Sequence, residues 1–184
     1  MRIAKLHQEY NVDLKYTLFP LHPYVPDEGM TLEELFKGRN FDLNAVQQHI
    51  RNLAAEEGLD YGERSKTYNS RLAQELAKWA ETQPNGSKIH DRMYRAYFYE
   101  GTNLANIEAL ADAAAEIGLD RVQALKTLES REYQKDVDAD WNRCRKMGVM
   151  AVPTYLCNGR NLIGAQTYEA LVDLVVSAGA KSRD

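Results

Sequence analysis

The sequence predicts a mixed α/β (α+β) protein in which a large all-helical block separates two short strand-forming stretches. Residues 12–18 alternate apolar and polar side chains, which is typical of a half-buried strand. From residue 31 to about residue 133 the apolar residues recur at helical spacing. Near the other end, Asn158-Gly159 separates two short apolar runs, which is the strongest short-range signal of a β-hairpin. The 184 residues are enough for one domain or for a domain with an insertion.

The N-terminal segment predicts the end of a helix followed by a strand. Apolar residues within 1–10 fall at positions i, i+3 and i+7 and share one helical face. The strand predicted at 12–18 runs into Pro20 and Pro23, which cannot donate to a sheet ladder. We therefore expect an extended connection before the helical block begins.

The helical block combines apolar stripes with start and stop signals. Thr31 and Glu34 have the spacing of a capping box, and Asp120 is a suitable N-cap. Gly58 and Gly118 follow apolar stripes, as glycines that end helices do. The expected helices span residues 31–36, 43–54, 70–80, 88–99, 106–117, 120–128 and 132–147.

The C-terminal segment predicts a hairpin and a closing helix. The expected strands are 153–157 and 161–163, and the expected helix is 167–178. Proline at position 153 fits the start of a strand, where its missing N–H costs no ladder hydrogen bond. Spacing alone favours an ordinary trans proline there, because cis is the rarer isomer of an X-Pro bond.

Composition excludes several classes of function. Hydrophobic residues make up 44% of the chain and charged residues 27%, as in ordinary globular proteins. The net charge of −4 argues against broad nucleic-acid binding, which needs a basic face. No apolar run reaches the ~20 residues of a membrane span, and the N-terminus is no secretory signal. We expect a soluble, cytoplasmic protein without nucleic-acid or membrane partners.

The metal-ligand types are sparse and scattered. Cys144 and Cys157 do not form a Cys-x-x-Cys pair, and the four histidines do not cluster. The sequence therefore predicts no metal site.

Five short motifs, in this order along nearly the whole chain, resemble the DsbA family of thioredoxin-fold proteins. The closest resemblance is to its FrnE-like branch, commonly labelled DSBA oxidoreductase. The motifs are Phe19-Pro20-Leu21-His22-Pro23, Asn69-Ser70-Arg71-Leu72-Ala73, Arg95-Ala96-Tyr97-Phe98 with Glu100-Gly101, Ala115 to Asp120, and Gly148-Val149 with Val152-Pro153-Thr154, Asn158-Gly159 and Gly164-Ala165-Gln166.

The resemblance implies a thioredoxin-like fold with a large all-helical insertion. It divides the chain into residues 1–29, a partial thioredoxin-fold half, 30–133, the helical insertion, and 134–184, the C-terminal half. It also implies that Pro153 is the family's cis-proline, that Val152 faces the active site and that Thr154 begins the strand. These three residues are the expected substrate-binding residues.

The family's chemistry lies in an N-terminal strand followed by Cys-x-x-Cys at the start of a helix, where the thiol pKa is lowered. The chain contains no such βα element, so no catalytic residue is assigned within it. Three explanations stay open. The cysteines lie upstream of a start codon assigned too late, a partner chain supplies the strand as in a swapped homodimer, or the domain has lost its catalysis.

Three functions follow from the resemblance. The first is a thiol–disulfide oxidoreductase acting on thiol or disulfide groups of a protein or peptide, without a cofactor. The second is a non-redox, chaperone-like module that captures extended peptides. The third is an enzyme like kappa glutathione transferase or hydroxychromene-carboxylate isomerase, in which serine replaces the first cysteine and glutathione is bound.

The remaining side-chain groups favour structural roles. Basic neighbours would favour a thiolate at Cys144 if it were exposed, but Cys144 and Cys157 are expected to be unpaired and to pack as small hydrophobic residues. The aromatic and basic helix 92–99 is expected to bury its aromatic side chains and expose its arginines. Trp79 and Trp141 are expected in the core or at a domain interface.

Overall fold

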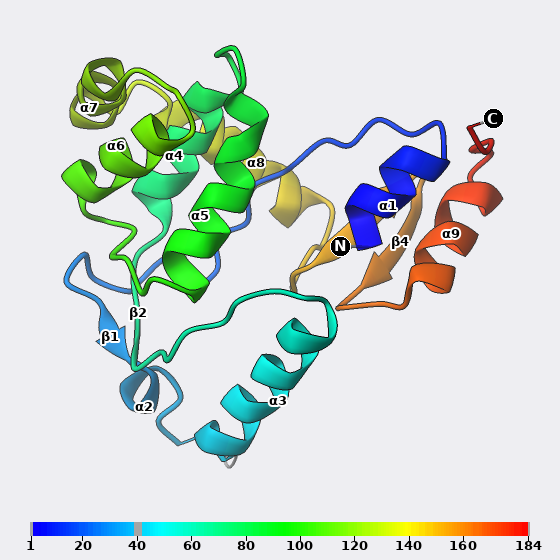
Figure 1. Cartoon of the computed structure of the whole chain (residues 1–184), viewed down its shortest axis with the longest axis horizontal. Helices are drawn as coiled ribbons and strands as arrows, with labels where there is room; N and C mark the ends of the chain where they lie inside the picture. Colours follow the sequence, from blue (N-terminus) through cyan, green and yellow to red (C-terminus); the bar gives the residue numbers. More distant parts are fainter. Residues whose placement is uncertain (1, 39–41, 184) are drawn as a thin grey trace. The chain divides into compact units, whose positions relative to one another are not determined.

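A computed structural model describes residues 2–38 and 42–183 of the chain (Figure 1). The chain divides into two compact units. Residues 1–19 and 140–184 form the first, which we call the terminal unit, and residues 20–139 form the second, the helical unit. The resemblance places the first boundary later, after residue 29, and the second boundary earlier, after residue 133. The predicted mixture of many helices and a few short strands is confirmed, but only the C-terminal end of the chain forms the strands that were predicted.

The terminal unit is a β-hairpin covered on one face by two helices. Its elements are α1 (Arg2–Glu9), β3 (Thr154–Cys157), β4 (Arg160–Ile163) and α9 (Tyr168–Ser177). The two strands pair antiparallel, and Tyr155 lies opposite Leu162. Both side chains pack against a small core of Leu6, Leu171 and Val175. Figure 1 shows α1 and α9 beside the hairpin.

The other face of the hairpin is open. Successive side chains of a strand point to opposite faces, so Thr154 and Leu156 face away from this core. Leu156 and Ile163 are accordingly exposed. Within the part of the chain that the structure describes, β3 pairs with β4 along one edge only.

The strand predicted at residues 12–18 is wrong, because the structure assigns no strand to this segment. A strand needs a neighbouring strand that shares its ladder of hydrogen bonds, and no described strand pairs with these residues. The segment is held near its ends instead. The Asn11 N–H donates to the Lys181 carbonyl at 2.8 Å, and the Leu18 N–H donates to the Asp140 carboxylate at 3.0 Å.

The helical unit contains most of the predicted helices, at nearly the predicted bounds. Its elements are β1 (Met30–Thr31), α2 (Leu32–Leu35), α3 (Leu43–Glu56), β2 (Lys66–Thr67), α4 (Arg71–Ala80), η1 (Gly86–Lys88), α5 (Ile89–Phe98), α6 (Ile107–Glu116) and α7 (Arg121–Ser130). Helix α8 (Gln134–Lys146) begins in this unit and continues into the terminal unit. The short pairing of β1 with β2 was not predicted, since two residues are too few for a periodic signal.

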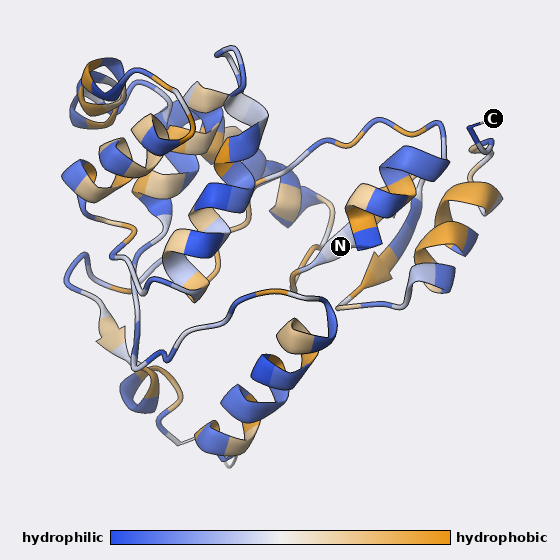
Figure 2. Cartoon of the chain, viewed as in Figure 1, coloured by the Kyte–Doolittle hydropathy of each residue, from blue (hydrophilic) through white to orange (hydrophobic). Residues whose placement is uncertain are grey.

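The core of the helical unit lies among α4, α5, α6 and α7. Leu76, Ile89, Leu110 and Leu128 are fully buried there, and alanines such as Ala114 allow the helices to approach closely. Figure 2 shows the apolar stripes of these helices alternating with hydrophilic faces. The expectation that Trp79 belongs to the core is confirmed.

The predicted helix caps form as expected. Thr31 accepts from the Glu34 N–H at 3.1 Å while the Glu34 carboxylate accepts from the Thr31 N–H at 2.9 Å, which completes the capping box. Asp120 accepts from the N–H groups of Val122 and Gln123 at 2.8 and 3.0 Å. These local hydrogen bonds satisfy N–H groups that a helix leaves unpaired at its start.

Helix α3 differs from the other long helices because it buries no residue. Its apolar stripe, Val46, Ile50 and Leu53, is exposed. The periodicity that predicted the helix is therefore present, and it is not used for packing within the described residues.

The expectation that the segment 92–99 buries its aromatic side chains and exposes its arginines is wrong at three positions. Tyr94 and Tyr99 are exposed, whereas only 11% of the Arg92 side chain is exposed. Arg92 lies within 2.8 Å of the Glu116 carboxylate and within 2.9 Å of the Glu100 carboxylate. These two partners make the burial of its guanidinium tolerable, since a buried charge requires opposite charges and hydrogen bonds.

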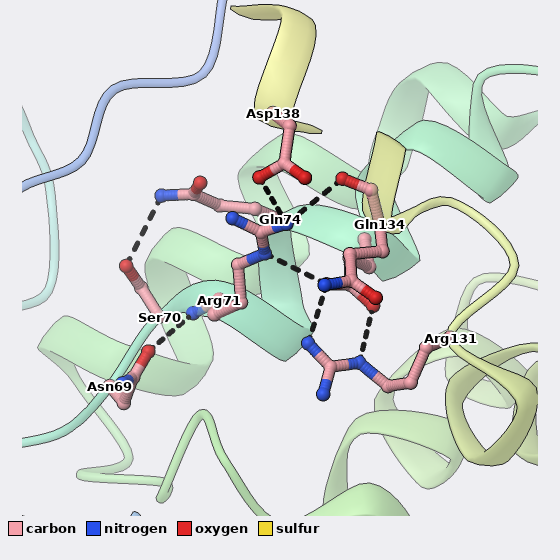
Figure 3. A network of polar contacts seen from close by, with 8 residues as sticks. Asn69, Ser70, Arg71, Gln74, Arg131, Gln134 and Asp138 are labelled. Atoms are coloured by element: carbon pink, nitrogen blue, oxygen red, sulfur yellow. Dashed lines mark hydrogen bonds and ion pairs between the residues drawn. The ribbon is translucent and has the colours of Figure 1, made fainter. Parts of the chain in front are cut away.

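Glu75 of α4 is the most deeply buried charged residue of the helical unit, with a side chain only 1% exposed. Arg131 donates from Nε and Nη2 to its two oxygens, each at 2.7 Å, and Arg71 donates from Nε at 2.8 Å. Arg71 also donates to the Asp138 carboxylate at 2.7 Å and to the Gln134 carbonyl at 2.9 Å. In Figure 3, dashed lines join Arg71 to Asp138 and to Gln134, and Arg131 lies beside them.

His90 provides a prediction about stability and pH. Burial lowers the pKa of His90 because it disfavours the charged imidazolium, and the Glu81 carboxylate 3.3 Å away opposes this only in part. Unfolded histidine has a pKa of about 6.5, so the unfolded state binds more protons near that pH. The free energy of unfolding should therefore decrease as the pH falls through this range. Chemical denaturation between about pH 7.5 and 5 tests this, and an unaltered slope in His90→Gln contradicts it.

No helix among the described residues is long and apolar enough to cross a membrane.

Candidate functional site

The three residues expected to bind substrate lie in the loop between α8 and β3, within the terminal unit. The loop starts at a well-formed helix end. The Gly148 N–H donates to the Arg145 carbonyl at 3.1 Å, and the Val149 N–H donates to the Cys144 carbonyl at 3.0 Å. Gly148 has φ = 66°, a left-handed conformation that glycine adopts without strain. The helix end thus fixes where the loop begins.

Two hydrogen bonds hold the other end of the loop. The Thr154 hydroxyl donates to the Ala151 carbonyl at 2.6 Å, and the Gly164 N–H donates to the Pro153 carbonyl at 2.8 Å. Thr154 begins β3, at the position that the resemblance implies. The peptide bond between Val152 and Pro153 is cis.

Val152 lies between these fixed neighbours and is the accessible residue of the loop. The residue is 45% exposed. Its backbone N–H and carbonyl take part in no hydrogen bond with any residue that the structure describes. An exposed residue with both peptide groups available can pair with the backbone of an extended ligand.

The predicted turn anchors the hairpin that carries the loop. Asn158 and Gly159 have φ of 44° and 79°, which a two-residue type I′ turn requires. The Asn158 side-chain amide also donates to the Ala178 carbonyl at the end of α9, at 2.7 Å. The hairpin prediction is confirmed, and in the structure Thr154 lies opposite Ile163.

The two cysteines are free and occupy different environments. Cys144 is 5% exposed, and its thiol donates weakly to the Leu18 carbonyl, with the sulfur 3.6 Å from the oxygen. Burial raises the pKa of Cys144, which disfavours the thiolate needed for redox chemistry. Cys157 is half-buried and packs against the core of the terminal unit. Their expected role as small packing residues agrees with these surroundings.

Other residues of the five motifs have structural positions. The Asn69 side-chain oxygen accepts from the Arg71 N–H at 2.9 Å, and the Asn69 amide donates to the Val25 carbonyl at 2.9 Å. Gly118 has φ = 86° directly after α6. These residues shape the helical unit.

Two features beside the loop were not assigned to the site from the sequence, although the basic residues were noted there as neighbours of Cys144. Met147 and Met150 are both exposed, and Met150 is 89% exposed. The last turn of α8 before them carries Arg143, Arg145 and Lys146, all exposed. Both features could be found from the sequence, because these residues come shortly before Val152 and must therefore lie near the loop.

Comparisons with known proteins agree with this architecture. A family model described as a DSBA-like thioredoxin domain matches residues 1–176. The protein YwbO of Bacillus subtilis (strain 168) is 32% identical over 96 residues, covering 51% of this chain and 48% of YwbO. The match thus spans about half the length of this curated relative.

Solved structures show a similar fold. The probable DsbA oxidoreductase SCO1869 from Streptomyces coelicolor aligns with a TM-score of 0.74 and 23% identity, over 85% of this chain and 70% of that one. The cytosolic disulfide reductase DsbM from Pseudomonas aeruginosa aligns with a TM-score of 0.51 and 19% identity, over 71% of this chain and 69% of that one. At these identities the similarity shows a shared fold, here the thioredoxin-like fold with a helical insertion.

Proposed function

Because the chain belongs to the DSBA-like thioredoxin domain family, we propose that it acts in thiol–disulfide exchange with protein or peptide substrates. In this proposal Val152, Pro153 and Thr154 form the surface on which an extended substrate segment lies. The proposal includes membership of the FrnE-like branch. It also places the protein in the cytoplasm, since two free cysteines fit a reducing compartment.

The observation that supports the proposal is that the peptide groups of Val152 are available for hydrogen bonding. Its N–H and carbonyl are available, while the carbonyls of Ala151 and Pro153 on either side are already bonded. A substrate strand beside Val152 would extend β3 at the edge that β4 does not occupy. Main-chain pairing of this kind does not require one particular substrate sequence.

The exchange needs a dithiol that these 184 residues do not contain, because their two cysteines form no Cys-x-x-Cys pair. One dithiol sulfur, as thiolate, attacks a sulfur of the substrate disulfide, and the other substrate sulfur leaves as a thiolate and takes up a proton. The second dithiol sulfur then breaks the mixed disulfide. The dithiol is oxidised by two electrons and the substrate disulfide is reduced. We propose that residues outside these 184, of this protein or of a partner in a homodimer, supply the dithiol.

The experiment is to read the coding sequence upstream of Met1 in frame, weigh the protein isolated from its source, and assay it with a fluorescent disulfide-linked peptide. We expect a Cys-x-x-Cys pair in the isolated protein or its partner, and peptide reduction by that assembly. The 184-residue chain alone should give no dithiol turnover, because its cysteines are a buried thiol and an isolated half-buried one. The redox proposal would be overturned if the isolated protein has the same mass as this chain, no partner supplies a dithiol and the peptide is not reduced.

A second candidate is peptide binding without redox chemistry, which the lack of a Cys-x-x-Cys pair in this sequence favours. It shares the surface at Val152 and differs only in that no disulfide exchange occurs after the peptide has bound. Protection of an unfolded client protein from aggregation by the isolated chain would support this candidate. Binding without any exchange in the source protein would favour it over the oxidoreductase.

A further inference from the structure

We propose that the substrate segment recognised at Val152 is an extended peptide that carries apolar side chains at the loop and carboxylates close by in its sequence. This inference rests on the proposed function, because it names the substrate class of the same surface. It is carried by the last turn of α8, which we call the basic turn and which consists of Arg143, Arg145 and Lys146.

The basic turn is a local exception in an acidic chain whose net charge is −4. All three side chains are exposed. Among the residues that the structure describes, none of the three forms an ion pair, and Arg145 donates only to the Asn142 side chain, at 2.7 Å. Cations at the C-terminal end of a helix interact favourably with its dipole, which helps to explain their presence there. Three of them without carboxylate partners also leave an attractive site for a negatively charged ligand.

The basic turn and the loop are held next to each other by the helix end. The Met147 N–H donates to the Arg143 carbonyl at 3.0 Å, in addition to the two bonds from Gly148 and Val149. Met147 and Met150 are exposed beyond this point, as is Val152. Methionine side chains are flexible and adapt to varied apolar partners. Along the chain from Val152 back to α8, exposed apolar side chains thus come first and the cations after them.

Chain geometry limits how far apart the two parts of the ligand can be. Lys146 and Val152 are six residues apart in sequence, and a chain spans at most about 3.3–3.6 Å per residue. The two residues are thus no more than about 22 Å apart. An extended peptide rises about 3.3 Å per residue, so its carboxylates must lie within about six or seven residues of the segment that pairs with Val152.

The test measures binding of fluorescein-labelled nonapeptides to the 184-residue chain by anisotropy. Each peptide has Val-Ser-Val at one end and three identical residues, Glu, Gln or Lys, at the other. We expect the glutamate peptide to bind about fivefold to tenfold more tightly than the glutamine peptide, since each exposed ion pair contributes modestly. This preference should shrink in about 0.5 M salt, where exposed charges are screened.

Two variants that remove the same amount of charge show which residues cause the preference for the glutamate peptide. Arg143→Gln/Arg145→Gln/Lys146→Gln should abolish the preference for glutamate. Lys88→Gln/Lys126→Gln/Lys135→Gln removes the same charge from exposed positions of the helical unit, and it should keep the preference. A preference that both variants lose would assign the effect to net charge and overturn the proposal.

A peptide N-methylated at the Val-Ser-Val segment separates this inference from the proposed function. Loss of binding on N-methylation, with equal affinity for all three charge types, would leave the substrate surface at Val152 standing and overturn the acidic preference. Failure of every peptide to bind would count against the surface itself. A dimer seen by sedimentation, and lost in the basic-turn variant, would assign the turn to a second copy of the chain and overturn the proposal.

Discussion

Replacing Glu75 by alanine should lower the free energy of unfolding by about 3 kcal/mol, the lower end for breaking a buried ion pair, because the buried Arg71 keeps other partners and the Arg131 side chain is 42% exposed. Arg131 would lose both of its bonds to the carboxylate. Arg71, whose side chain is only 15% exposed, would keep Asp138 and the Gln134 carbonyl. Urea denaturation followed by circular dichroism measures the change.

The matched control for Glu75 is Asp112→Ala. Asp112 accepts from Arg121 Nε at 2.6 Å, and both side chains of this pair lie on the surface. Exposed pairs of this kind contribute about 0–1 kcal/mol. The free energy of unfolding of this variant should therefore be close to that of the original chain. Equal destabilisation by the two substitutions would mean that burial of Glu75 is not what makes its network important.

Replacing Gly86 by alanine should also lower the free energy of unfolding, by about 3 kcal/mol. This is the upper end of the usual cost of overpacking. Gly86 is buried at the start of η1, and a Cβ atom there would lie 1.6 Å from the Ala80 carbonyl oxygen and 2.4 Å from its carbon. Both are backbone atoms of the end of α4, which cannot move aside as a flexible side chain can. Thermal unfolding of Gly86→Ala against the original chain measures the effect.

Gly118→Ala distinguishes a steric clash from backbone strain. Gly118 has φ = 86° and nothing within 4 Å of where its Cβ would be. Alanine there suffers only the cost of a left-handed conformation, about 1–2 kcal/mol. If Gly86→Ala were no worse than Gly118→Ala, the close approach of Ala80 to Gly86 would not be a constraint on the fold.

The helices could be predicted because their signals are local. The capping box at Thr31 and the N-cap at Asp120 are visible within a few residues of sequence, and both are present. The hairpin could be predicted for the same reason, since Asn158 and Gly159 determine the turn themselves. The lack of a strand at 12–18 could not be predicted, because alternation describes one strand and says nothing about whether a partner strand is available.

The site could be predicted only in part, for a similar reason. The sequence and its resemblance identified Val152, Pro153 and Thr154 as the expected loop. That the Val152 peptide groups are available depends on which neighbours bond to Ala151 and Pro153, and this is a property of the folded hairpin. The burial of Arg92 likewise depends on carboxylates 8 and 24 residues along the chain.

The exposed stripe of α3 has a consequence for local unfolding. A helix that buries no side chain gains little from tertiary packing, and isolated helices of 14 residues are marginal in water. The free energy of opening α3 alone should therefore be far smaller than that of opening α4 or α6, whose residues form the core. Its amide protons would then exchange with solvent through fluctuations that leave the rest of the helical unit folded.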